Sequence, residues 1–437
     1  MVDFPPEVWH CVCSHLTAHE ARQVRLVCRL INKIALCHSF PKITFYLHQE
    51  DLAFLQKIAN SPILARNVKQ LTYISNLMNT DMILDDFVQA RRQAEKMDKE
   101  YAMMRKTLYV SKRLTKSELA VCYYKNYIPT VNQQEEALAK FLDFECLAKA
   151  LPSFKSLEEV TMSGGITYCA GRDTKTPFAN CLVELSKHLK PDGCRHLEAL
   201  IHGLQGLDHK LQRLNAGVIS WEFFDRNPIE FKQLLNVCCN LSSLKLEIDT
   251  GLIDTGHDDD RILGSEVPDC RVVMKKGLLR YFLAALPRLQ VLSILFTFRN
   301  EKFDLYPAGL EDVLDPGHKW VDLKELNLQN IECTRQELMA TLTLHKDTLR
   351  TLSLNSISLK NTSWLKLLPD LRNNLDLEEA MVDEIFGGSE LYHGVPEYWS
   401  LSGPRSDPAE DDLRYELVRY LVKSTDELPL SHSNMGP

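Results

Sequence analysis

The sequence predicts an α/β protein in which a short all-helical N-terminal module precedes an irregular α/β solenoid with helical insertions. Three observations predict this architecture. The opening residues carry apolar side chains at helical spacing, several later segments alternate apolar and polar residues as strands do, and amphipathic helical segments precede most of those strands. We assign 1–40 to the module, 41–380 to the solenoid, and 381–437 to a C-terminal loop and a bracing helix.

The first helix of the module is expected to begin at two prolines. Pro5 and Pro6 suit a first helical turn, where their missing N–H groups would have no intrahelical partner. After them Val8, Val12 and Leu16 recur every four residues. This spacing predicts one apolar face that packs against a neighbour.

A second helix is expected to begin at the segment TAHE, residues 17–20. Thr17 and Glu20 have the spacing of a capping box, in which each residue satisfies a backbone N–H of the other. Continued through the segment, this helix would place Val24, Val27, Ile31 and Ile34 on its inner face. Two such helices are too small to bury a self-sufficient core, so we expect them to lean on the rest of the chain, on a partner, or on both.

The same residues resemble an F-box. The family typically opens with Leu-Pro-x-Glu-Leu and closes on an aliphatic-Val-Cys-Arg run before an aromatic residue. The matching residues here are Phe4, Pro5, Glu7, Val8, Val12, Leu16, Glu20, Leu26, Val27, Cys28 and Arg29. The chain departs from the pattern at Phe4, where Leu is usual, at Ala21, where Leu is usual, and at Ile31, where Trp or Phe is usual. The matching segment covers under a tenth of the chain. With this segment the chain resembles fungal-type F-box proteins.

This resemblance implies docking onto a Skp-family adaptor and, through it, onto the cullin of a ubiquitin ligase. The chain would then be the substrate-recognition subunit, with no catalytic residue, cofactor or metal of its own. The adaptor-binding residues would be Phe4, Pro5, Val8, Val12, Leu16, Val24, Leu26 and Val27. The alternatives are a scaffold that uses the same module without ubiquitin transfer, and an enzyme with an unrecognised site.

The cysteines and histidines of the module allow a metal site as a rival interpretation. His10, Cys11, Cys13 and His15 are close in sequence, but on a helix they fan around the axis and cannot converge on one tetrahedral ion. The thirteen cysteines of the chain form no C-x-x-C pair. In a reducing compartment we expect buried or free thiols.

Beyond residue 40, segments with an L-x-x-L-x-L rhythm predict strands. They begin near residues 68, 157, 211, 241, 289, 323 and 349. A helix-strand unit repeated in series is typical of a leucine-rich-repeat solenoid. The later strands are separated by about 30, 48, 34 and 26 residues, whereas regular repeats span about 20–29. An α/β domain with parallel strands and no true repeat therefore remains open.

Three segments interrupt this pattern. We expect a helical insertion at about 80–130, with a partner-docking helix as the alternative. The segment 163–177 is either a binding loop or a plain connection between units, and 249–269 is an acidic, solvated insertion without the spacing of a calcium loop.

The C-terminal segment is expected to be loop-like from about residue 381 and then helical. Asp407 can cap this last helix and Pro408 suits its first position. Its apolar stripe consists of Leu413, Leu417, Tyr420 and Leu421. We expect the helix to brace the open end of the solenoid, because terminal units of such arrays need covering.

Composition and motifs exclude several function classes. The formal net charge of -8 argues against nucleic acid as the main partner, which needs a clustered basic surface. No secretory signal and no apolar run of membrane-spanning length is visible, so we expect the cytoplasm, the nucleus or both and no membrane partner. No nucleophile elbow, phosphate loop, dinucleotide fingerprint or H-E-x-x-H motif occurs. The expected partners are the adaptor, the cullin and an unidentified protein target.

Overall fold

The chain divides into two compact units, Met1–Lys210 and Leu211–Pro437. Both come from a computed structural model. The model describes residues 5–75, 77–78, 83–85, 116–163, 192–207, 211–250, 266–297, 305–383, 385–392, 394–401 and 408–430. The boundary between the units falls inside the predicted region 41–380, and the division at residues 40 and 380 stays a prediction.

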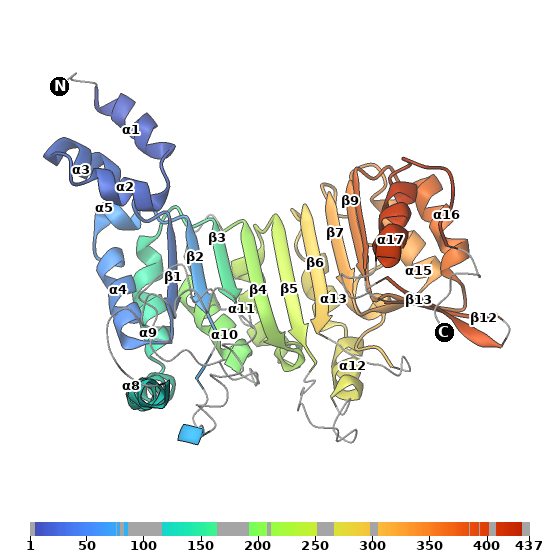
Figure 1. Ribbon diagram of the computed structural model, residues 1–437, viewed down its shortest axis with the longest axis horizontal. Helices are drawn as coiled ribbons and strands as arrows, with labels where there is room; N and C mark the ends of the chain where they lie inside the picture. Colours follow the sequence, from blue (N-terminus) through green and yellow to red (C-terminus); the bar gives the residue numbers. More distant parts are fainter. Residues whose placement is uncertain are drawn as a thin grey trace. The chain divides into compact units, whose positions relative to one another are not determined.

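Unit 1 contains a parallel sheet, and Figure 1 shows the N-terminal module above one end of its strands. Its strands β1, β2 and β3 pair in chain order and without a register shift. They span Lys42–Tyr46, Gln70–Ile74 and Glu159–Ser163. Helices α4 and α9 contact each other, and α9 contacts α10. The helices after the module are α4 (Gln49–Ala59), α5 (Pro62–Ala65), α8 (Lys116–Ala139), α9 (Leu142–Ala150) and α10 (Asp192–Leu204), with a 3-10 turn η1 (Leu151–Ser153).

A buried polar triad ties this sheet to its helices. The Tyr73 hydroxyl of β2 donates to Asp143 Oδ2 on α9 at 2.8 Å, and Arg195 of α10 donates to both oxygens of that carboxylate at 2.7 and 2.9 Å. The Asp143 side chain has no exposed area. A buried carboxylate is tolerated only with a charged partner, so Arg195 fixes α10 against α9.

Unit 2 is built on six described strands that pair in chain order, every neighbouring pair being parallel. They are β4 (Arg213–Ser220), β5 (Ser243–Asp249), β6 (Val291–Thr297), β7 (Glu325–Gln329), β9 (Thr351–Asn355) and β11 (Glu379–Asp383). The seven predicted strand segments correspond to β2, β3, β4, β5, β6, β7 and β9. The prediction of an α/β protein is therefore confirmed, with a large parallel sheet.

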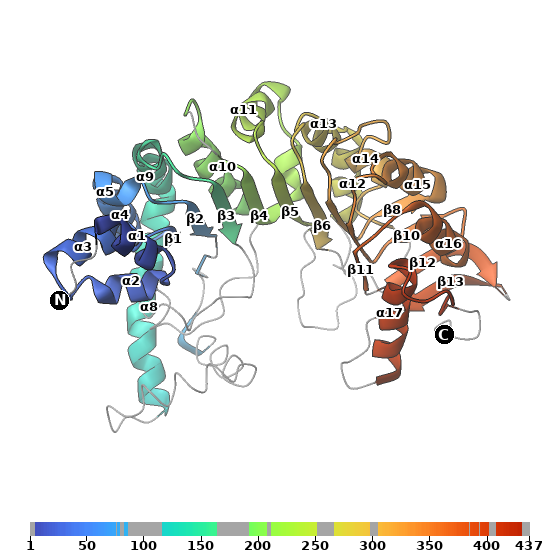
Figure 2. The same ribbon diagram turned by 90° about the horizontal axis from the view of Figure 1, so that it is seen from above.

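Helices cover one face of the unit 2 sheet, as α11, α13 and α15 show in Figure 2. Leu244, Leu292, Leu326 and Leu352 are opposite one another in register and are all buried. The described helices are α11 (Pro228–Cys238), α12 (Val267–Lys275), α13 (Leu278–Ala284), α14 (Leu310–Val313), α15 (Arg335–Leu344), α16 (Trp364–Asn374) and α17 (Pro408–Leu421), with a 3-10 turn η2 (Trp221–Phe224). No helix in the described residues is both long and apolar enough to traverse a bilayer.

A second, smaller sheet has the order β13-β12-β10-β8. Its strands span Glu332–Thr334 (β8), Ser358–Lys360 (β10), Ile385–Tyr392 (β12) and Val395–Ser400 (β13). The predicted loop after residue 381 was wrong, because β12 and β13 form an antiparallel pair there. A Cβ at Gly388 would clash with Glu397 Oε2, so glycine at this position allows close packing within the strand.

The last helix is confirmed as α17, which starts at Pro408 and buries Leu417, Tyr420 and Leu421. It contacts β11 and α16. Asp407 lies outside the described residues. The C-terminal part of the predicted insertion, 116–130, is helical within α8. Residues 86–115, 164–177 and 251–265 lie outside the described part of the chain, and the end of the predicted acidic segment belongs to α12.

Candidate protein-docking module

The N-terminal module begins with α1, Pro6–Ser14. Pro5 is the N-cap residue and Pro6 the first helical residue, as expected from the missing N–H groups. The Pro5 carbonyl accepts from the Val8 N–H at 3.0 Å, which closes the first turn. Pro5 is exposed, and Phe4 lies outside the described residues.

The predicted second helix is two helices, α2 (Ala18–Val24) and α3 (Arg29–Leu36). The capping box at the start of α2 is confirmed, since the Thr17 N–H donates to Glu20 Oε2 at 2.8 Å and the Glu20 N–H donates to Thr17 Oγ1 at 3.2 Å. The prediction of one continuous helix was wrong because the backbone is extended at Cys28, which starts a new helix.

The module has a small core of its own. Its core cluster consists of the buried residues Cys13, Ile31, Ile34 and Ala35, and Trp9, Leu16, Val24 and Cys28 pack against them. The face of α1 that turns inward therefore carries Trp9 and Cys13, whereas Val8 and Val12 lie on the outer side. The expected inner position of Val27 was wrong: it falls in the break between α2 and α3 and is 61% exposed.

Five large aliphatic side chains of the module face solvent although its core is complete without them. They are Val8, Val12, Leu26, Val27 and Leu30, exposed by 40%, 44%, 85%, 61% and 45%. Four belong to the predicted docking set, whereas Leu16 and Val24 of that set are half-buried in the module. Sequence reasoning missed Leu30; its position directly after the run Leu26 to Arg29 was the available signal.

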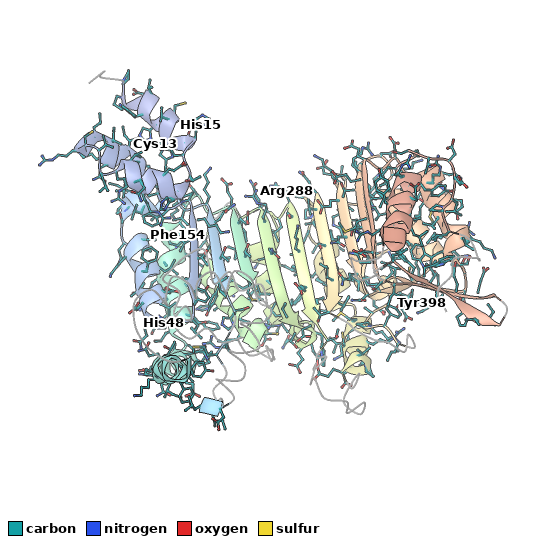
Figure 3. The ribbon with its side chains drawn as sticks, in the orientation of Figure 1. Cys13, His15, His48, Phe154, Arg288 and Tyr398 are labelled. Atoms are coloured by element: carbon teal, nitrogen blue, oxygen red, sulfur yellow. The ribbon has the colours of Figure 1, made fainter. Side chains whose placement is uncertain are left out.

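The four candidate metal ligands of the module point in different directions. Cys13 is buried, and burial raises the pKa of its thiol, whereas Cys11 is exposed. Both Cys13 and His15 can be found in Figure 3, and His15 is exposed at the end of α1. His10 instead meets His38, with Nδ1 and Nε2 3.3 Å apart. Within the described ranges, no group of three potential ligands is arranged to hold a metal ion.

Local contacts fix the helices of the module relative to one another. Arg25 Nε at the end of α2 donates to Asn32 Oδ1 of α3 at 3.0 Å. The Ser39 hydroxyl donates to the Ala35 carbonyl at 2.7 Å and terminates α3. The contact between Arg25 and Asn32 joins α2 to α3 at the break where Leu26 and Val27 are exposed.

The exposed aliphatic side chains of the module could be covered by another protein. Covering such a surface with another protein favours binding by about 25 cal/mol for each Å² of apolar area removed from water. No model of a known protein family matches the chain, and a search of curated proteins likewise finds no match.

Proposed function

We propose that the N-terminal module is an F-box that docks onto a Skp-family adaptor, and that the chain is the substrate-recognition subunit of a cullin-based ubiquitin ligase. One observation carries the proposal: Val8, Val12, Leu26, Val27 and Leu30 are exposed on a three-helix unit that does not need them for its own core. Such exposure in a short module fits a surface that a partner protein covers.

We further propose that the β-α units of unit 2 form a leucine-rich-repeat-like solenoid that receives the protein target. The parallel strands in chain order support this proposal. Asn330 and Ser356, which follow β7 and β9, both have positive φ values of 56° and 46°. The Asn330 side-chain amide donates at 2.5 Å to the carbonyl of Phe296, which lies on the neighbouring strand β6. A short strand, β8 or β10, follows each of these turns.

The docking proposal is tested with Leu26→Asp. Leu26 is 85% exposed, so the substitution leaves the core of the module intact. We expect at least a tenfold loss of affinity for the purified Skp-family adaptor in calorimetric titration, since central interface anchors typically contribute about 2 kcal/mol or more. Leu391→Asp is the matched control, because Leu391 is 67% exposed on β12 of unit 2, and it should bind normally. Absence of adaptor binding by the unmodified protein at micromolar concentration would refute the proposal.

Ubiquitin transfer is a separate step of the proposal. A scaffold would bind the adaptor through the same module without shortening the lifetime of its target. The half-life of a captured target protein, compared between cells that carry the unmodified chain and cells that carry Leu26→Asp, separates the two functions. We expect a longer half-life with Leu26→Asp; an unchanged half-life together with lost adaptor binding would favour the scaffold.

A further inference from the structure

The face of the unit 2 sheet opposite α11, α13 and α15 is polar. Strand alternation places one residue of each pair on this face, and the register aligns Lys245, Ser293, Asn327 and Ser353 across four strands. The next row contains Glu247, Leu295, Gln329, Asn355 and Asp383. Helix α17 lies on this side, beside β11 (Figure 2). We call this surface, over β5, β6, β7 and β9, the polar face; Lys245 on it is exposed, whereas Ser293 and Ser353 are buried.

Among the residues that the structure describes, two amide side chains on the polar face have acceptor oxygens without a hydrogen-bond partner. Asn355 is only 9% exposed, and its Nδ2 donates to Ser353 Oγ at 3.3 Å, which shows that both side chains lie on the same face. Asn355 Oδ1 and Asn327 Oδ1 are both buried and find no donor in the described residues. A buried acceptor without a donor is costly, because it has lost its water and gained nothing. Each of these two oxygens can still accept a hydrogen bond, either from a buried water or from a ligand that displaces it.

Acidic side chains outnumber basic ones on this side of the sheet. The acidic ones are Glu247, Asp249, Glu325, Glu379 and Asp383, and the basic ones of the strands are Arg213 and Lys245. Two of the acids already have partners: Asp383 pairs with Arg414 of α17 at 3.1 Å, and Asp249 accepts from the Thr297 hydroxyl at 3.0 Å.

The Glu247 carboxyl group differs from those of Asp383 and Asp249 in its electrostatic surroundings. Burial raises the pKa of its carboxyl group, and the neighbouring Asp249 adds to the effect. No ion pair joins Glu247 to a basic side chain among the residues that the structure describes. A cation brought to this carboxylate would offset both influences and favour its charged form.

We propose that the polar face binds a lysine- or arginine-bearing segment of a target protein. Its N–H groups would donate to Asn327 Oδ1 and Asn355 Oδ1, and its cationic group would meet Glu247. This inference deepens the proposed function, on which it rests, because it states the chemistry of the target. An acidic segment would meet unfavourable charge at Glu247, and nucleic acid would meet the same repulsion.

The experiment uses the full-length protein and fluorescent oligolysine, oligoarginine and oligoglutamate, with binding followed by anisotropy at about 0.15 M salt. We expect the two cationic peptides to bind and the anionic one not to bind. Glu247→Gln and Asn355→Leu should each weaken cationic peptide binding about tenfold. Glu230→Gln, a neutralisation at an exposed position on α11, is the matched control and should leave binding unchanged.

Asn355→Leu adds a readout that general electrostatics would not move. The substitution removes an acceptor that lacks a donor together with the long hydrogen bond to Ser353 Oγ, so the urea midpoint of unfolding should change little while peptide affinity falls. No binding of either cationic peptide would overturn the inference, and so would an equal loss in Glu230→Gln, which indicates attraction to the net charge alone.

The two proposals fail independently. Leu26→Asp should bind oligolysine normally, and Glu247→Gln should bind the adaptor normally. Normal adaptor binding together with no peptide binding would overturn the polar face and leave the docking module standing. Peptide binding that depends on Glu247, together with no adaptor binding, would overturn the docking module and leave the polar face standing.

Discussion

Aligned leucine side chains are buried in the unit 2 sheet, whereas Leu26 and Leu30 are exposed in the N-terminal module. In the sheet, Leu244, Leu292, Leu326 and Leu352 occupy one register row and none is more than 2% exposed. In the module, Leu26 is 85% exposed and Leu30 is 45% exposed, although a packed core lies close by. The sheet turns its polar residues outward, whereas the module turns aliphatic residues outward.

This difference separates two kinds of recognition. Exposed aliphatic side chains gain most when another apolar surface covers them, and their contribution is insensitive to salt. Polar side chains with unused acceptors and carboxylates gain most from a donor-rich, cationic ligand, and salt screens that attraction. We therefore expect adaptor binding to persist at high salt and binding to the polar face to weaken as salt rises.

The largest effect is expected from the same substitution at two leucines. Leu326→Ala removes a side chain that is 1% exposed in the sheet and should lower the free energy of unfolding by about 2–5 kcal/mol. Leu26→Ala removes one that is 85% exposed and should change it by about 0.5 kcal/mol or less. Urea unfolding of the two variants measures both values.

The comparison breaks if the two variants lose similar stability. A large loss in Leu26→Ala would mean that Leu26 is part of the core, and the exposed surface would no longer be available for docking.

A smaller effect is expected within the module, where Leu16 and Val12 both lie on or just after α1. Leu16 packs against the core of the module, so Leu16→Ala should lower both its stability, by about 1–2 kcal/mol, and its adaptor affinity. Val12 is 44% exposed, so Val12→Ala should lower adaptor affinity with little change in stability. Hydrogen exchange of the α3 amides together with adaptor titration separates the two outcomes. Protection of α3 that is reduced equally in both variants would contradict this assignment of the two faces.

The sequence predicted the strands of the parallel sheet better than the surface of the module. Period-two leucine patterns identified β4, β5, β6, β7 and β9, because helices bury one face of these strands and the pattern has to repeat. The break between α2 and α3 was not predictable in this way, since Val24, Ile31 and Ile34 keep helical spacing on both sides of it. Only the extended backbone at Cys28 shows that Val27 leaves the inner face.

The hairpin of β12 and β13 escaped prediction for a different reason. Gly387 and Gly388 lie within β12, although glycine is depleted in strands and common in turns. The Trp364 indole N–H donates to the Gly387 carbonyl at 3.0 Å, and Glu397 of β13 accepts from the Trp364 backbone N–H at 2.8 Å. These are tertiary contacts between residues 23 and 33 positions apart, which local sequence patterns do not carry.

The smallest effect is expected at the capping box of α2. Hydrogen bonds from the backbone N–H and the hydroxyl of Thr17 lower the pKa of the Glu20 carboxyl group. A carboxyl group whose pKa is lower in the folded state contributes stability above its unfolded pKa of about 4.3, and this contribution is lost as the pH falls through the folded value. Glu20→Gln can still accept from the Thr17 N–H but does not titrate. We therefore expect the amide protection of α2 to fall between about pH 5 and pH 3 in the unmodified protein and to stay flatter in Glu20→Gln. If amide protection of α2 depends on pH in the same way in both proteins, Glu20 is not the titrating group. Helix α2 would then be held by the packing of Ala21 and Val24 alone.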